Sequence, residues 1–346
     1  LNSVINGRKD GAMIIAEEST AWPKVTHSPE DGGLGFTFKW NMGWMHDFLE
    51  YMKLDPYFRK HNHNKMTFGI TYSTSENFIL VLSHDEVVHL KCSMINKMPG
   101  EYEDKFANLK AGYTFMLGHP GKKLLFMGQE FGQVHEWNEN DDLDWDLLQF
   151  PLHKQLQDYV KALNTFYREH PAMYQEDYYP EGFQWINCTY HEESLAMFVR
   201  KTKKPEETLL FVCNFDNIEH EAFRVGVPFY GKYKEIFGSE EERFGGAGSA
   251  NARAKTAKAM EWDGRDYSIE IHIPAMSVTI FSCTPLEEKK PAVKKAAEKL
   301  AEAKIVKKSS AKAKVVKKEA KAGSTVKAGK EEKKAAPAKA ESTAKT

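Results

Sequence analysis

The feature that most constrains this chain is a pattern that occurs four times within about its first 172 residues. Each time, an apolar run of strand length stops on polar or aromatic residues, and a longer segment, helical in character after the third run, leads to the next. The four segments are AMIIAEES (12–19), LGFTFKWNMGW (34–44), NFILVLSHDE (77–86) and KKLLFMGQEFG (122–132). Such alternation is typical of a parallel sheet covered on both faces.

Polar or aromatic side chains follow each predicted strand. They are Glu17 and Glu18, then Trp40 and Asn41, then His84, Asp85 and Glu86, then Gln129 and Glu130. The carboxyl ends of parallel strands meet at one edge, which is the catalytic face of a (β/α)8 barrel. We expect the apolar residues before the first carboxylates, Met13, Ile14 and Ile15, to be buried.

At 346 residues, the chain is long enough for at least two folded units. Residues 173–285 predict an all-β sandwich, because short alternating strands are bounded by turns. The predicted strands are SLAMFVRKT (194–202), TLLFVCNF (208–215), FRVGV (223–227) and YSIEIHIPAMSVTIFSC (267–283). Residues 151–173 predict an amphipathic helix that ends at Pro171, and residues 244–259 predict a mobile loop. The apolar positions of this helix are Leu156, Tyr159, Val160, Leu163 and Phe166.

Residues 286–346 contain 19 Lys, 8 Glu and no aromatic residue, whereas the remainder holds 29 basic and 41 acidic residues. This composition predicts a disordered basic tail, because too little apolar surface is available to offset chain entropy. A nucleic-acid-binding arm is the alternative. The interspersed Glu and the absence of Arg disfavour it.

The sequence also bears on where the protein works. No apolar run reaches the roughly 18 to 20 residues that span a bilayer, and the N-terminus lacks the order of a signal peptide. Four scattered cysteines without a Cys-x-x-Cys pair predict free buried thiols in a reducing compartment. We therefore expect a cytoplasmic protein with no membrane partner.

Two histidine motifs raise the alternative of a metal site. In SHDEVVH, His84 and His89 are five residues apart. On a helix they would lie about 140° apart, so they would not share a face as zinc ligands do. HNH at 61–63 has no evident third ligand. We expect neither motif to bind a metal.

Carboxylates at strand ends indicate glycoside cleavage instead. A retaining reaction needs a nucleophile and an acid/base about 5 to 5.5 Å apart, and a nearby anion raises the pKa of the acid/base. Glu17 and Glu18 cannot form this pair, because successive strand residues point to opposite faces. Carboxylates from separate strands are required.

Five motifs resemble those of the glycogen (1,4-α-glucan) branching enzymes in the α-amylase superfamily. They are AEEST, GFTFKWNMGWMHD, VLSHDEVVH, HPGKKLLFMGQEFGQ and EWNENDDLDWDLL, and the similarity runs to about residue 285. It implies the C-terminal half of a catalytic (β/α)8 barrel at 1–172, a β-sandwich at 173–285 and a tail at 286–346. It also implies that α-1,4-glucan chains of glycogen or amylose are transferred to a 6-hydroxyl, with no metal or cofactor.

The resemblance implies roles for single residues. Glu17 falls on the general acid/base, Asp85 on the residue that stabilises the oxocarbenium-like transition state, and His84 on a ligand of sugar hydroxyls. Glu18 would face the packing layer as a structural carboxylate.

Several further residues are candidates for glucan binding. Trp40 and Trp44 flank a strand end, where their rings could stack on glucose. Asp47 and Glu130 are polar candidates, although a salt bridge would explain either equally well. Core packing is the better interpretation of the remaining aromatic residues near this edge, which are Trp22, Phe131, Trp137 and Trp145.

The chain departs from the family at the nucleophile. The family carries it as an Asp on an LRVDAV-like strand upstream of the AEE strand, and nothing in this sequence matches that segment. Four strands cannot close an eight-stranded barrel. We expect the C-terminal portion of a longer enzyme, inactive without its N-terminal half. The alternatives are a related hydrolase, such as a debranching enzyme or trehalohydrolase, and a non-catalytic glucan-binding protein.

Overall fold

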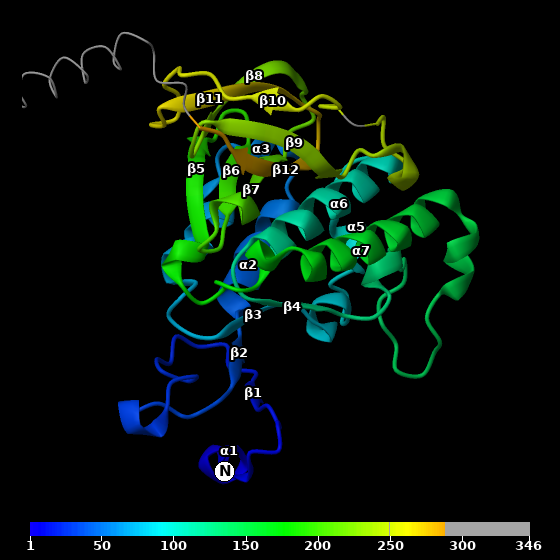
Figure 1. The fold of residues 1–346 in the computed structure, drawn as a ribbon. Helices are drawn as coiled ribbons and strands as arrows, with labels where there is room; N and C mark the ends of the chain where they lie inside the picture. The colour runs from blue at the N-terminus through cyan, green and yellow to red at the C-terminus, as the bar shows by residue number, and fades with distance from the viewer. Residues whose placement is uncertain (249, 288–346) are drawn as a thin grey trace, which may run out of the picture. The chain divides into compact units, whose positions relative to one another are not determined.

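Four short strands form a parallel sheet in the computed structural model, which describes residues 1–248 and 250–287 (Figure 1). They lie in the order β1-β2-β3-β4, so neighbours in the chain are neighbours in the sheet. The strands are β1 (Ile15–Ala16), β2 (Phe38–Trp40), β3 (Phe78–Leu82) and β4 (Lys122–Leu125). All three pairings are parallel, so all four carboxyl ends lie on one edge, as the sequence predicts.

Helices follow the last three strands. They are α2 (Met42–Met52), α6 (Tyr102–Gly118) and α7 (Pro151–Glu169). Shorter helices are α1 (Asn2–Arg8), α3 (Pro56–Arg59), α4 (Asn64–Thr67) and α5 (Met94–Lys97). α2 begins directly at the end of β2, because the side chain of Asn41 accepts a hydrogen bond from the Trp44 backbone N–H at 2.9 Å. The predicted apolar face of α7 is buried, which confirms that helix.

The edges of the parallel sheet are less covered than its middle. Each residue of β3 is buried, whereas all of β4 is only half-buried. The prediction that Met13, Ile14 and Ile15 are buried is wrong, because Met13 and Ile15 are 65% and 45% exposed and Ile14 is only half-buried. Within the described residues β1 pairs with β2 alone, so no strand covers its outer side.

Two further sheets form the all-β region. A six-stranded sheet has the order β10-β9-β12-β7-β6-β5, and β11 pairs with β8. The strands are β5 (Phe183–Tyr190), β6 (Leu195–Arg200), β7 (Leu209–Asn214), β8 (His220–Val227), β9 (Gly231–Gly238), β10 (Lys255–Thr256), β11 (Tyr267–Ile273) and β12 (Ser277–Pro285). An apolar cluster that includes Met197, Val225 and Ile271 joins the two sheets face to face. The predicted strands are present, and β5, β9 and β10 were missed.

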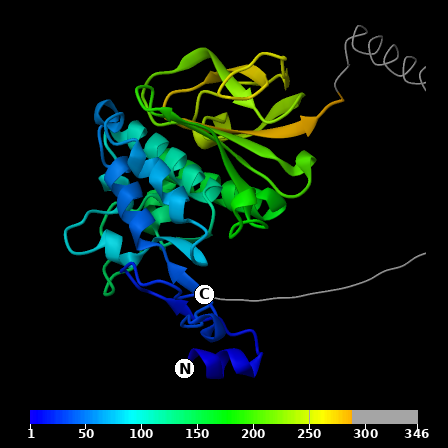
Figure 2. The same ribbon diagram turned by 90° about the vertical axis from the view of Figure 1, so that its left-hand side faces the viewer.

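The helical and all-β regions share one apolar core, and Leu1–Glu287 form one compact unit. Figure 2 shows the helix α6 lying against the six-stranded sheet, where it contacts β7 and β12. The division at residue 172 stays a prediction. The predicted tail spans residues 286–346, of which all but Leu286 and Glu287 lie outside the described residues.

A buried ion pair within residues 173–285 also contacts the preceding helix and strand. Arg200 on β6 and Asp177 are fully buried, and the guanidinium lies 2.7 Å from the carboxylate. Arg200 also donates to the Gly118 carbonyl at the end of α6 at 2.9 Å, and Asp177 lies 2.9 Å from Lys122 on β4. These contacts fix the β-domain against the strand and helix that precede it.

We predict that Asp177→Ala lowers the free energy of unfolding by about 3 to 5 kcal/mol, because it leaves a buried guanidinium without its carboxylate. Denaturant unfolding measures this. Asp158→Ala is the matched control, since its pair with Lys154 is about half exposed and should be worth less than about 1 kcal/mol. Equal effects of the two substitutions would contradict the structural role of the pair.

Candidate active site

Glu17 and Asp85 each follow the carboxyl end of a strand, at the same edge of the parallel sheet. Glu17 follows β1 directly, and its side chain makes no hydrogen bond or ion pair with the described part of the chain. Asp85 lies in a 3-10 turn that begins at His84, just after β3. One strand, β2, separates them, which places the two strands about 10 Å apart across the sheet. Glu17 is exposed, and the Asp85 side chain is about two-fifths exposed.

The neighbouring carboxylate, Glu18, is held in a different way. Its Oε2 lies 2.8 Å from Nζ of Lys39 on β2, a lysine that is only 5% exposed. Lys39 also donates to the carbonyls of Thr20 at 2.9 Å and Trp22 at 3.4 Å. The hydrogen bond from Lys39, together with those from the hydroxyl and backbone N–H of Thr20, lowers the pKa of Glu18 to about 2, so this carboxylate stays ionised. Lys39 thus ties the segment after β1 to β2.

His84 and Asp85 form the second group at this edge. His84 Nε2 lies 3.1 Å from Asp85 Oδ1, and both side chains are more than two-fifths exposed. The His84 ring meets the edge of Trp137 at a centroid distance of 5.7 Å and lies 6.0 Å from Phe126. The two predicted residues therefore lie together, with polar atoms open to solvent and an aromatic backing.

The structure separates the two predicted tryptophans. Trp40 is half-buried at the end of β2, beside the candidate edge. Trp44 is only 2% exposed and stacks on Phe48 at 4.8 Å. The prediction that Trp44 binds glucan is therefore corrected, because the first turn of α2 directs its ring into the core.

Asp47 and Glu130 stay predictions. Asp47 is half-buried on α2, and this burial raises the pKa of its carboxyl. Glu130 is half-buried and lines an open cavity of about 400 Å³ whose other lining residues all belong to α7. No ion pair of either carboxylate is seen in the described ranges.

The sequence interpretation missed Lys39 and the contact of Trp137 with His84. Lys39 could have been noticed, because a lysine inside an otherwise apolar strand indicates a buried ammonium, and a buried ammonium needs a partner. The contact of Trp137 could not be noticed in this way, since its partner His84 lies far away in sequence.

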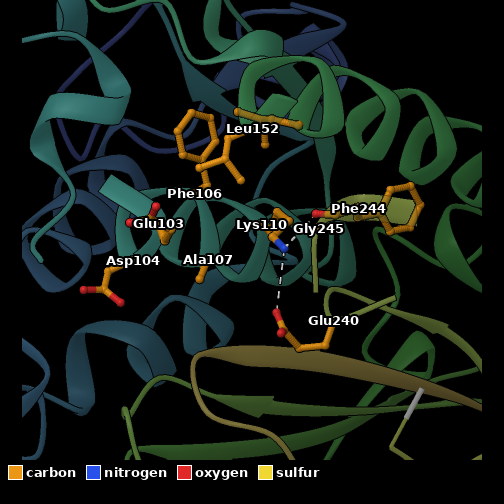
Figure 3. Close-up of a pocket in the computed structure, with 10 residues that line it drawn as sticks. Glu103, Asp104, Phe106, Ala107, Lys110, Leu152, Glu240, Phe244 and Gly245 are labelled. Carbon is orange, nitrogen blue, oxygen red and sulfur yellow. Dashed lines mark hydrogen bonds and ion pairs between the residues drawn. The ribbon is translucent and has the colours of Figure 1, made fainter. Parts of the chain in front are cut away.

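A cavity of about 190 Å³ lies away from this edge, between α6, α7 and the segment that follows β9 (Figure 3). Lys110 projects into it and lies 3.7 Å from Glu240. Its ammonium donates to the carbonyls of Ser239 at 2.9 Å and Phe244 at 3.2 Å. None of the predicted site residues lines this cavity.

Within residues 1–248 and 250–287, no group of three or more His, Cys, Asp or Glu side chains is arranged to hold a metal ion. In the same ranges, no helix combines the length and apolarity required to cross a membrane.

Comparisons with known proteins agree with the two regions. Residues 185–284 match the family model described as alpha amylase, C-terminal all-beta domain. The chain is 54% identical over 281 residues to the 1,4-alpha-glucan branching enzyme GlgB of Butyrivibrio fibrisolvens, which covers 81% of this chain and 44% of that protein. The chain is a relative of the 1,4-α-glucan branching enzymes. The enzyme of Halothermothrix orenii is 50% identical, over 81% of this chain and 45% of that protein.

The chain thus spans less than half the length of these relatives. Solved structures show the same fold at much lower identity. An alpha-amylase from Anoxybacillus matches 83% of this chain and 55% of its own, with a TM-score of 0.54 and 15% identity. A cyclomaltodextrinase matches 81% of this chain and 42% of its own, with a TM-score of 0.55 and 14% identity. The described residues therefore have an α-amylase-like fold with an all-β C-terminal domain.

We predict that Lys39→Met raises the pKa of Glu18 from about 2 toward its ordinary value of about 4.5, because the main hydrogen bond to the carboxylate is lost. A carboxyl NMR titration measures the change. Lys24→Met is the control, since Lys24 is exposed and bonds to the Asp31 carbonyl instead. A Glu18 pKa that stays near 2 in Lys39→Met would contradict the assignment.

Proposed function

We propose that this chain supplies part of the active site of a glycogen branching enzyme. The observation that carries the proposal is that Glu17 and Asp85 share one sheet edge, within a segment closely similar to enzymes of that name. The substrate would be an α-1,4-glucan such as glycogen or amylose. The proposed place of action is the cytoplasm, and neither a membrane nor a nucleic acid is a proposed partner.

In this proposal Glu17 acts as the general acid/base. It protonates the glycosidic oxygen as the bond breaks and later takes the proton from the acceptor 6-hydroxyl. Its exposed carboxyl, free of ion pairs within the described residues, has the access that both steps need. Asp85 would stabilise the positive charge that develops on the sugar, and His84 would bind a hydroxyl.

We further infer that the nucleophile and the remaining barrel strands come from the N-terminal half of the same enzyme. Two observations support a half-barrel. β1 and β4 each have one strand neighbour among the described residues, and apolar side chains at β1 are exposed. Strands paired with these two edges would cover those side chains and close the sheet.

The test combines this chain with the N-terminal part of the Butyrivibrio fibrisolvens enzyme. The mixture is incubated with amylose, and both α-1,6 linkages and free reducing ends are counted. We expect new branches without a matching rise in reducing ends. Reducing ends without branches would favour a hydrolase, because water and a sugar hydroxyl can be activated by the same base. Glucan binding without either product would favour a non-catalytic protein.

In the combined enzyme, we predict that Glu17→Gln lowers the branching rate by about 10²- to 10⁴-fold, because the amide cannot exchange the proton. Glu30→Gln, a matched change at an exposed residue, should leave the rate unchanged. Near-normal turnover in Glu17→Gln would remove Glu17 from the acid/base role.

A further inference from the structure

The loop that follows Asp85 has an unfavourable backbone. His89, Leu90 and Cys92 have φ values of 57°, 64° and 67°, in the left-handed region that side chains with a Cβ rarely adopt. Leu90 is 96% exposed, so burial of its side chain does not hold the loop. Such a conformation persists only where surrounding groups fix it.

Glu136 is one group that fixes this loop. Its Oε2 accepts a hydrogen bond from the Leu90 backbone N–H at 3.0 Å, and its Oε1 accepts one from the Cys92 N–H at 2.6 Å. Lys97, which is only 6% exposed, donates to the Cys92 carbonyl at 3.0 Å and to the Lys91 carbonyl. The carboxylate thus holds two strained residues at once.

The loop is in turn connected to the candidate catalytic group. Lys91 Nζ donates to the Asp85 backbone carbonyl at 2.7 Å and lies 3.9 Å from Glu86. The residue after Glu136 makes a second connection, because the Trp137 N–H donates to the Val87 carbonyl at 2.9 Å. The segment 136–137 therefore contacts the turn of Asp85 both directly and through Lys91.

We infer that Glu136 is a positioning residue for Asp85, an inference that rests on the proposed function. Glu136 fixes the backbone of Leu90 and Cys92, this fixes Lys91 between them, and Lys91 holds the turn that carries Asp85. The carboxylate acts through the loop and touches no reacting atom. Each of its two oxygens accepts from one N–H donor, an arrangement that Gln, with a single acceptor oxygen, does not reproduce.

The first test uses this chain alone. In Glu136→Ala, amide hydrogen exchange at Leu90 and Cys92 should become at least about tenfold faster, because both acceptors are removed. Glu136→Gln should give a smaller increase, since one acceptor oxygen remains. The exposed thiol of Cys92 should also react faster with a thiol reagent, while Cys213 and Cys283 stay buried. Glu139→Gln, at an exposed neighbour, is the control. Unchanged exchange in Glu136→Ala would overturn the inference.

The second test uses the combined enzyme. A displaced Asp85 stabilises the transition state less well, so Glu136→Ala should lower kcat about tenfold or more while KM changes little. The melting temperature should stay close to that of the control. Faster exchange with an unchanged kcat, or a loss of activity that only follows loss of folding, would overturn the positioning role.

Failure of the proposed function would look different. In that case the unaltered combined enzyme would form no branches. The positioning role in branching would fall with it, and the exchange data would decide separately whether Glu136 holds the loop.

Discussion

The parallel pairing of β1, β2 and β3 is the interaction on which the candidate site depends. It brings residues from far-apart segments to one edge, and β1 contributes two register pairs, Ile15 and Ala16, beside the Ile14 carbonyl that accepts from the Thr37 N–H. So short a pairing holds Glu17 weakly by itself. The ion pair from Lys39 to Glu18 adds a second connection between the same two strands, and it lies immediately beside Glu17. Glu18 therefore anchors the short segment that carries Glu17, the candidate acid/base, to β2.

The rest of the fold supports this edge from behind. From Phe106 onward almost every residue of α6 is buried, between the parallel sheet and the β-domain. Arg59 adds a buried connection, because its guanidinium donates to the Phe215 carbonyl at 2.9 Å and to Asn108 Oδ1 at 2.6 Å. Together with Arg200 and Asp177, it makes the β-domain an integral support of the helices rather than a separate attachment.

Much of the architecture could be predicted from the sequence, because periodicity reports local structure directly. The strands β1 to β4 and the apolar face of α7 were found in this way. Burial could not be predicted so well, because it depends on neighbours. Met13 and Ile15 were predicted to be buried, but β1, which begins at Ile15, has one partner strand in the described structure. Trp44 read as a ligand contact, and the turn set by Asn41 directs it inward.

Long-range polar contacts were the least predictable part of the site. Glu136 lies more than forty residues from the amides that it binds, and no local pattern marks such a pairing. β5 and β9 were missed for a related reason. Polar and charged residues interrupt both strands, as in FQWINCTY and GKYKEIFG, and pairing with neighbouring strands decides their conformation.

The central claim is that Glu17 and Asp85 serve one glucan-binding edge. A crystal structure of this chain together with the N-terminal half of a branching enzyme, bound to a maltooligosaccharide-derived inhibitor, tests it most directly. The account predicts that both carboxylates lie within about 3 Å of polar atoms of the same glucosyl unit. An inhibitor that contacts only one of them, or that binds at another face of the sheet, would contradict the account.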